Sequence, residues 1–303
     1  MPTLLALADL AWQRLPLPGR FVAKEVRIGP LPALEMYRAV AGRPVMKVYA
    51  YAVGDTLVDT GLVGVGDAVV AWARGLGARA AFLTHHHEDH AGNAARLDAA
   101  GIPVHASPLT EALLAADLPI PLYEHLAWGR PPPARTRPFP AELELDGEPV
   151  QVIPAPGHCV DQVCVWMPSR GWLFAGDVFL HERVRLFRRD EDFAATVATL
   201  ERLGSLGVET LWCAHRPVLT RGGDALAAKL QHLRDLEGRV RELHARGYAP
   251  RRIARELRLG GSFTFQVLSA GDASTTNLVN SILRGPTPRA EVAQVMARLG
   301  GGP

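Results

Sequence analysis

A six-residue segment of the chain carries side chains that commonly bind metal ions. It contains His85, His87, Asp89 and His90, in the order His-x-His-x-Asp-His. On an extended chain, side chains two positions apart project to the same side, so His85 and His87 can bind one ion. A turn into a following helix would carry Asp89 and His90 toward a second position. Imidazole and carboxylate ligands together favour zinc, with iron and manganese as alternatives.

Four ligands from one segment cannot complete two metal sites, so further ligands should come from other parts of the chain. Three candidates follow directly after apolar, strand-like stretches, and these are His158, Asp177 and His215. Taken singly, each could be an ordinary capping or hydrogen-bonding residue. Because all three share the strand-end position of the first segment, we expect them to meet it at one edge of the fold.

The segments around these residues alternate between strand and helix patterns. Residues 33–60 are rich in apolar and β-favouring residues, and Gly54-Asp55 is typical of a hairpin turn. Residues 67–76 and 91–100 have helical periodicity. This alternation predicts mixed sheets covered by helices. Between Pro119 and Pro140 the pattern breaks at seven prolines, which indicates a surface excursion or a lid over a site.

The sequence changes to consecutive helical patterns after about residue 220. The expected helices cover residues 224–245, 250–259, 274–283 and 288–299. We therefore predict a catalytic domain over residues 1–220 and a C-terminal helical extension over residues 221–303. Residues 221–258 hold ten Lys and Arg against five Asp and Glu, so this region could contact phosphates of a nucleic acid. A solvated helical face explains the same composition. The basic residues do not alternate with aromatic side chains on which bases could stack, as they do in sites for single-stranded nucleic acids.

The overall composition excludes several classes of protein. The chain has 303 residues, of which 48% are hydrophobic, and a formal net charge of +2, so it is neither disordered nor fibrous. No stretch reaches the roughly 20 apolar residues of a membrane span, and three cysteines cannot form a disulfide framework. The short apolar stretch Leu4–Ala8 lacks a preceding basic residue, so it predicts an N-terminal helix rather than a secretory signal. We expect a cytoplasmic protein.

Five motifs, in order along the chain, resemble those of metallo-β-lactamase-fold hydrolases. They are Leu57-Val-Asp-Thr-Gly61, the segment His85–His90, Pro156-Gly-His158, Gly176-Asp177 and Ala214-His215. The resemblance covers about residues 30–220. It implies an α/β protein with the four-layer αββα sandwich of the metallo-β-lactamase fold, and a site for two divalent metal ions, zinc above all, at one edge of the sandwich.

The resemblance also implies a role for each matching residue. The first metal would be bound by His85, His87 and His158, and the second by Asp89, His90 and His215. Asp177 would bind both metals. Asp59 would hold the histidine segment in place. A hydroxide bridging the two metals would then attack a carbonyl or phosphoryl centre. Asp89 would orient that hydroxide or relay a proton to the leaving group.

The reaction class follows from the branch of the family that the motifs match. The histidine segment is similar to that of type II glyoxalases, which implies hydrolysis of a small ester, thioester or lactone. The glutathione-binding basic motif of those enzymes has no match in residues 221–303. The resemblance therefore does not imply a glutathione thioester as the substrate. The alternatives are a phosphodiesterase or ribonuclease of the same fold, a mononuclear iron dioxygenase of the persulfide-oxidising type, and a binding module without activity.

Four more residues are candidates for contacts with substrate. His181 and Arg183 follow Asp177 closely, Tyr123 lies in the proline-rich excursion, and Arg216 stands where the family usually has glycine. For each of them a surface or packing role is the alternative. The expected partner is a small-molecule substrate, and no contact with a membrane is expected. Binding of nucleic acid and formation of a homodimer stay open.

Overall fold

Two β-sheets stacked face to face form the centre of the protein. The computed structural model describes residues 19–260 and 263–300, and within them the larger sheet has seven strands and the smaller has four. The larger sheet consists of β1 (Arg20–Ile28), β2 (Leu31–Val40), β3 (Arg43–Val53), β4 (Thr56–Val58), β5 (Ala80–Phe82), β6 (Val104–Ala106) and β7 (Arg137–Pro138). The smaller consists of β10 (Gln151–Pro154), β11 (Val163–Met167), β12 (Trp172–Gly176) and β14 (Thr210–Cys213).

Strand direction changes within each sheet. Strands β1 to β4 pair antiparallel, whereas β4 to β7 pair parallel, so the carboxyl ends of β4 and β5 lie side by side. In the smaller sheet β10, β11 and β12 pair antiparallel, and β14 joins β12 in parallel. The remaining short strands are β8 (Glu144–Leu145), β9 (Glu148–Pro149), β13 (Phe187–Arg188) and β15 (Ala273–Ser274).

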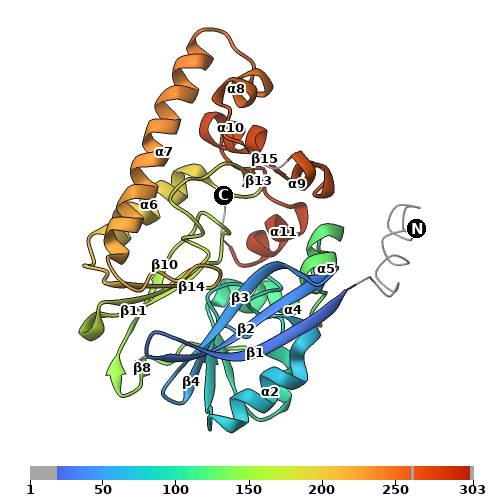
Figure 1. Cartoon of the computed structure of the whole chain (residues 1–303), viewed down its shortest axis with the longest axis vertical. Coiled ribbons are helices and arrows are strands. Elements are labelled where there is room, and N and C mark those ends of the chain that lie inside the picture. Colours follow the sequence, from blue (N-terminus) through green and yellow to red (C-terminus); the bar gives the residue numbers. More distant parts are fainter. Residues whose placement is uncertain (1–18, 261–262, 301–303) are drawn as a thin grey trace.

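Helices cover the outer face of each sheet (Figure 1). The helices that precede residue 180 are η1 (Val63–Val65), α2 (Gly66–Gly75), α3 (Ala94–Ala99), α4 (Pro108–Ala115), α5 (Leu122–Trp128) and η2 (Pro168–Arg170). Those that follow are α6 (Phe193–Gly204), α7 (Gly222–Ala245), α8 (Pro250–Leu257), α9 (Phe263–Leu268), α10 (Thr275–Arg284) and α11 (Ala290–Arg298). Helices α2 and α3 pack on the larger sheet, and α6, α7 and α10 pack on the smaller.

Strand β11 shows why the sequence folds into these layers. Its five residues are all buried. Val165 and Met167 pack between the two sheets, whereas Cys164 and Trp166 pack under the outer helices. Successive side chains of a strand point to opposite faces, so a strand that is covered on both faces needs a continuous apolar run.

An aromatic group joins the two sheets below the site. The ring of Tyr51 on β3 packs edge-on against Trp212 on β14, with centroids 5.4 Å apart. The Tyr51 hydroxyl donates to the carbonyl of Cys213 at 2.6 Å. This contact holds the end of β14, and hence the segment that carries His215, against the larger sheet.

The structure confirms the predicted fold class and adds elements that the sequence patterns did not indicate. Strand β1 lies before the predicted strand region, and α5 forms inside the proline-rich excursion. The N-terminal helix expected near Leu4–Ala8 lies outside the described residues. Helices α7, α8 and α10 share one core with the smaller sheet, and the domain boundary near residue 220 stays a prediction. No helix of the described chain is long and apolar enough to cross a membrane.

Candidate metal centre

Asp59 positions the histidine segment from the end of the neighbouring strand. Strands β4 and β5 are parallel neighbours, so Asp59 and Thr84 follow them at the same edge of the sheet. The Asp59 carboxylate accepts hydrogen bonds from the Thr84 backbone N–H at 2.8 Å and from Nδ1 of His90 at 2.8 Å. One buried carboxylate therefore holds both the beginning and the end of the segment.

The other predicted side chains reach the same place from the smaller sheet. His158 follows β10, Asp177 follows β12 and His215 follows β14. The backbone of Gly176, just before Asp177, has a positive φ of 48°, and a Cβ there would lie 2.7 Å from Oγ1 of Thr84. Glycine therefore lets the Asp177 loop approach the histidine segment closely.

Asp177 faces two groups of ligand-type atoms, one with each of its carboxylate oxygens. Its Oδ2 lies 3.4 Å from Nε2 of His158, which is 3.2 Å from Nδ1 of His87. Its Oδ1 lies 3.3 Å from Nε2 of His90 and 3.5 Å from Nε2 of His215. Ligands at the usual zinc distances lie about 3.3 Å apart around a tetrahedral ion. Three groups of side chains here have ligand atoms within 4.8 Å of one another and could hold a metal ion: His85, His90 and Asp177; Asp89, His90 and His215; and His85, His87 and Cys159.

Several atoms in this centre are buried and form no hydrogen bond, although carboxylate oxygens lie 3.1–3.5 Å from Nε2 of His90 and of His215. They are Nε2 of His85, Nε2 of His90, Nε2 of His215 and Oδ1 of Asp177. Leaving polar atoms buried and unpaired is costly, and metal coordination removes that cost. The donor set, which combines imidazole nitrogens with carboxylates, also fits divalent metals of the zinc type.

Hydrogen bonds on the far side of three histidines orient these free nitrogens. Nδ1 of His90 donates to Asp59, and Nδ1 of His215 donates to the carbonyl of Lys47 at 2.6 Å. Nδ1 of His85 lies 3.0 Å from Oγ1 of Thr84. Each contact fixes the ring so that Nε2 points into the centre, as outer hydrogen bonds do in metal sites generally.

The electrostatics differ between the two sides of Asp177. Burial lowers the pKa of His158 to about 3 and holds the pKa of His85 well below its usual value. Burial would also lower the pKa of His215, but the Asp177 and Asp89 carboxylates raise it to about 10. Asp89 contributes directly to this effect, since its Oδ2 lies 3.1 Å from Nε2 of His215.

Asp161 is a positioning residue that the sequence analysis did not identify. Its Oδ2 accepts from the backbone N–H of His86 at 2.9 Å and from Oγ1 of Thr110 at 2.9 Å. Its Oδ1 lies 2.7 Å from Nδ1 of His86. Asp161 therefore ties the histidine segment to the loop that carries His158, and it turns His86 away from the centre.

Arg188 was also missed, and it contacts a predicted ligand. Its Nη2 lies 2.7 Å from Nε2 of His87, and its Nη1 donates to Glu124 at 3.0 Å. Arg188 is 101 positions from His87 along the chain. No local spacing pattern could have revealed this contact, because only the path of β13 brings the two side chains together.

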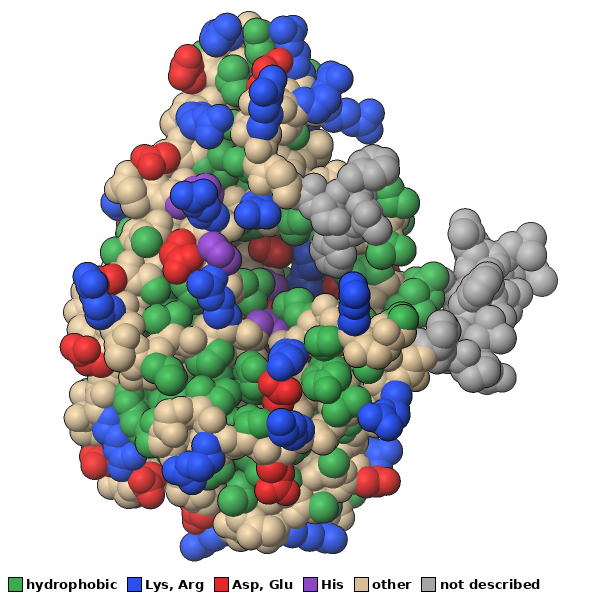
Figure 2. Space-filling view, viewed as in Figure 1, with side chains coloured by type: hydrophobic (Ala, Val, Ile, Leu, Met, Phe, Trp, Pro, Cys, Tyr) green, Lys and Arg blue, Asp and Glu red, His purple; other side chains and the backbone are tan. Residues whose placement is uncertain are grey.

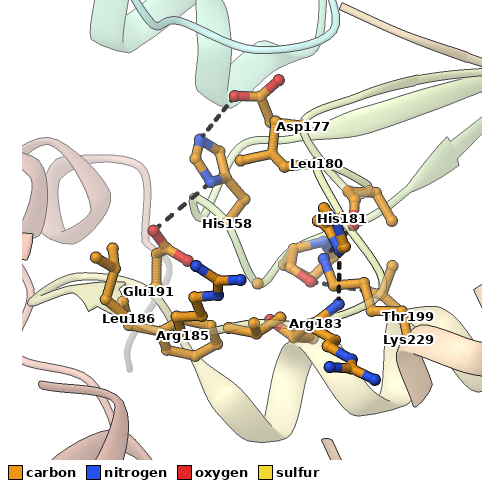
Figure 3. A pocket seen from close by; sticks show the side chains of 16 residues that line it. His158, Asp177, Leu180, His181, Arg183, Arg185, Leu186, Glu191, Thr199 and Lys229 are labelled. Atoms are coloured by element: carbon orange, nitrogen blue, oxygen red, sulfur yellow. Dashed lines mark hydrogen bonds and ion pairs between the residues drawn. The ribbon is translucent and has the colours of Figure 1, made fainter. Parts of the chain in front are cut away.

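A cavity of about 430 Å³ opens beside the centre, with His158 and Asp177 at one end (Figure 3). Figure 2 shows a hollow in the middle of this face, between the body of the molecule and the upper helices. Of the four predicted substrate contacts, His181 and Arg183 line the cavity, whereas Tyr123 and Arg216 do not. The Tyr123 hydroxyl instead donates to Asp272 at 2.8 Å.

Comparisons with known proteins point to one family. The family model of the metallo-beta-lactamase superfamily matches residues 44–215. A hydroxyacylglutathione hydrolase from Rhodobacter capsulatus is 32% identical over 222 residues, which cover 72% of this chain and 71% of that protein. A beta-lactamase-like protein 2 homolog from Caenorhabditis elegans is 26% identical over 91 residues, only 30% of the length of either protein.

Solved structures share the fold at low sequence identity. A metallo-beta-lactamase from Pontibacter korlensis aligns with a TM-score of 0.55 and 20% identity, over 71% of this chain and 100% of that one. A metallo-beta-lactamase family protein from Thermus thermophilus aligns with a TM-score of 0.51 and 17% identity, over 92% of this chain and 94% of that one. With the family model covering more than half of the sequence, the chain belongs to the metallo-beta-lactamase superfamily.

Proposed function

We propose that the protein is a hydrolase that uses two divalent metal ions, zinc in the first instance, to cleave a small ester, thioester or lactone. The observation that carries this proposal is the position of Asp177, which directs one carboxylate oxygen toward each group of ligand-type atoms. The hydroxyacylglutathione hydrolase from Rhodobacter capsulatus supports a thioester as the first substrate class to test.

The ligand assignment in this proposal follows the resemblance to metallo-β-lactamase-fold hydrolases. The first metal would be held by His85, His87 and His158, the second by Asp89, His90 and His215, with Asp177 shared. Bound there, divalent ions would supply Lewis acidity and would lower the pKa of water toward neutrality.

The protein's own groups complete the proposed reaction. Asp59 holds His90 and the histidine segment in place through its hydrogen bonds. The buried Asp89 carboxylate would accept a hydrogen bond from the attacking water and would return a proton to the leaving group. The cavity beside His158 and Asp177 would hold the substrate and exclude bulk water from the reacting bond.

The basic helices do not favour a nuclease. Along α7 and α8, Arg241 lies 2.7 Å from Glu237 one turn away, and Arg252 lies 4.0 Å from Glu256. Arg252 also stacks 3.7 Å from the ring centroid of Tyr248. Such local pairs are typical of a solvated helical face. The cytoplasmic location and the homodimer stay predictions.

Metal content and turnover together test this proposal. We expect about two equivalents of metal in the purified protein and turnover on a panel of thioesters, lactones and carboxylic esters, with none on phosphodiesters. Asp177→Asn should lower kcat at least about a hundredfold and reduce the metal content. Asp98→Asn, an exposed aspartate on α3, is the matched control. Full activity of Asp177→Asn would refute the shared-ligand role.

A further inference from the structure

The hydrogen-bond partner of His87 differs in kind from those of the other histidines in the centre. The outer nitrogens of three of these face groups that can accept a hydrogen bond, namely the Thr84 hydroxyl for His85, the Asp59 carboxylate for His90 and the Lys47 carbonyl for His215. Nε2 of His87 instead lies 2.7 Å from Nη2 of Arg188. A guanidinium group has five N–H donors and no acceptor. Arg188 therefore donates, and Nε2 of His87 accepts.

This contact determines which nitrogen of the His87 ring carries the proton. A neutral imidazole has one nitrogen that accepts and one that carries the proton. Since Nε2 accepts from Arg188, the ring is neutral and its proton lies on Nδ1, which is 3.2 Å from Nε2 of His158. His158 is the other proposed ligand on this side of the centre. Nδ1 is therefore the nitrogen that the first metal would need, and it is occupied by a proton.

A metal-bound histidine requires the opposite arrangement. It binds the ion through one nitrogen and carries its proton on the other, which donates to an acceptor outside the site. If His87 binds metal through Nδ1, Nε2 carries the proton and directs it at Arg188, which cannot accept. Metal binding by His87 therefore requires the Arg188 guanidinium to leave Nε2.

The charge of Arg188 stays compensated when this contact is lost. Its Nη1 donates to Glu124 at 3.0 Å, and its Nε lies 3.5 Å from Asp190 and 3.9 Å from Glu191. The backbone N–H of Arg188 also donates to Glu191, at 3.2 Å, so the residue is anchored beside these carboxylates. What metal binding removes is thus the hydrogen bond to His87 and not the ion pairs.

We propose that Arg188 holds His87 in a metal-free arrangement and thereby weakens binding of the first metal relative to a site without this arginine. The inference rests on the proposed two-metal hydrolase and assigns Arg188 a role in setting the difference between its two sites. The first metal competes with a hydrogen bond from a charged donor, which corresponds to about tenfold to hundredfold in affinity. His90 and His215, proposed ligands of the second metal, have acceptors outside the site and no such competition.

Competition for zinc with a chromogenic chelator tests the inference. In Arg188→Gln one of the two zinc affinities should rise about tenfold to hundredfold and the other should stay unchanged, because the glutamine amide oxygen can accept from His87. Arg188→Lys keeps a cation with donors only and should stay near the wild-type values. Arg289→Gln is the matched control, because Arg289 pairs with the same Glu124 carboxylate at 3.1 Å, and it should leave both affinities unchanged.

Nitrogen NMR of the histidine rings observes the contact without any change at Arg188. In the metal-free wild-type protein the His87 proton should lie on Nδ1, and added zinc should move it to Nε2. Loss of signals in His87→Asn identifies the ring. Circular dichroism checks that Arg188→Gln folds, and if it does not, this measurement on the wild type decides. A proton on Nε2 of His87 before zinc is added would overturn the inference.

Turnover of esters and thioesters separates failure of the inference from failure of the proposed function. If none is cleaved but zinc affinity depends on Arg188 as expected, the hydrolase proposal fails and the inference stands. If esters are cleaved while folded Arg188→Gln binds zinc equally or more weakly than the wild type, the inference fails alone. A wild-type protein that binds no divalent metal would overturn both.

Discussion

Replacing Asp161 with asparagine should weaken the link between the two segments that carry the proposed ligands of the first metal. The Asp161 carboxylate accepts two hydrogen bonds from His86 and one from Thr110, of 2.7–2.9 Å, together with one from the Cys159 thiol, and the residue is 3% exposed. Asparagine presents an N–H group where one of these donors requires an acceptor. Hydrogen bonds to buried charged groups contribute about 1.5–3 kcal/mol each, so the free energy of unfolding should fall by about 3 kcal/mol.

The pH dependence of this loss has a defined sign. Burial would raise the pKa of Asp161, but His86 and the hydrogen bonds from Cys159 and Thr110 lower it. The stabilisation by Asp161 is therefore complete above the ordinary carboxyl pKa of about 4 and disappears as the pH falls through the lowered value. Burial would lower the pKa of His86, but Asp161 raises it. The ion-pair part of the stabilisation is thus complete below about pH 6.5 and is lost as the pH rises through the raised pKa of His86.

Urea unfolding of wild type and Asp161→Asn, followed by circular dichroism from pH 2 to pH 9, measures this difference. The gap in unfolding free energy should be largest between about pH 4 and pH 6.5 and should close in acid. Competition with a chromogenic chelator should show metal affinity about 10- to 100-fold weaker, as for other outer groups of metal sites. Asp98→Asn is the control. Equal stability of wild type and Asp161→Asn at pH 5 would refute the brace argument.

Three further predictions concern the histidine segment and its surroundings. Gly92→Ala should destabilise the protein by about 1–3 kcal/mol, because its Cβ would lie 2.3 Å from the carbonyl oxygen of Gly61. Gly75→Ala, at the end of α2 with open space around it, should be neutral or stabilising in the same thermal melts, and equal losses in both would contradict this. Asp59→Asn should weaken metal binding about 10- to 100-fold in chelator competition, and unchanged affinity would exclude its brace role. Removal of metal with a chelator should lower the melting temperature, and added zinc should restore it. A melting temperature that ignores the chelator would count against a resident metal.

The chemistry of the centre could be read locally because ligand-rich segments follow apolar strands. The spacing of His85, His87, Asp89 and His90 lies within six residues, and the patterns before His158 and Asp177 also show strand ends. Strand ends at one edge of a stacked pair of sheets meet in space, so the expectation that these side chains come together needs no long-range information. The alternation of strands and helices predicts mixed sheets covered by helices, and the family resemblance implies their arrangement as an αββα sandwich.

Other groups were invisible to such patterns. Arg188 reaches His87 across 101 positions, and Lys229 reaches the carbonyl of Val178 across 51. In the sequence, Lys229 is one of many basic residues in a helical stretch. Only the packing of α7 against the smaller sheet buries it at the cavity.

The sequence by itself predicted the alternation of strands and helices and the candidate metal ligands from short-range periodicity and residue type, and its family motifs implied the sandwich. The tertiary structure decided that Asp177 faces His158 with one carboxylate oxygen and His90 and His215 with the other. It also decided which cations line the cavity and which carboxylates tie the loops together. These features depend on contacts between residues far apart in the chain, and such contacts exist only after both sheets and their helices have packed.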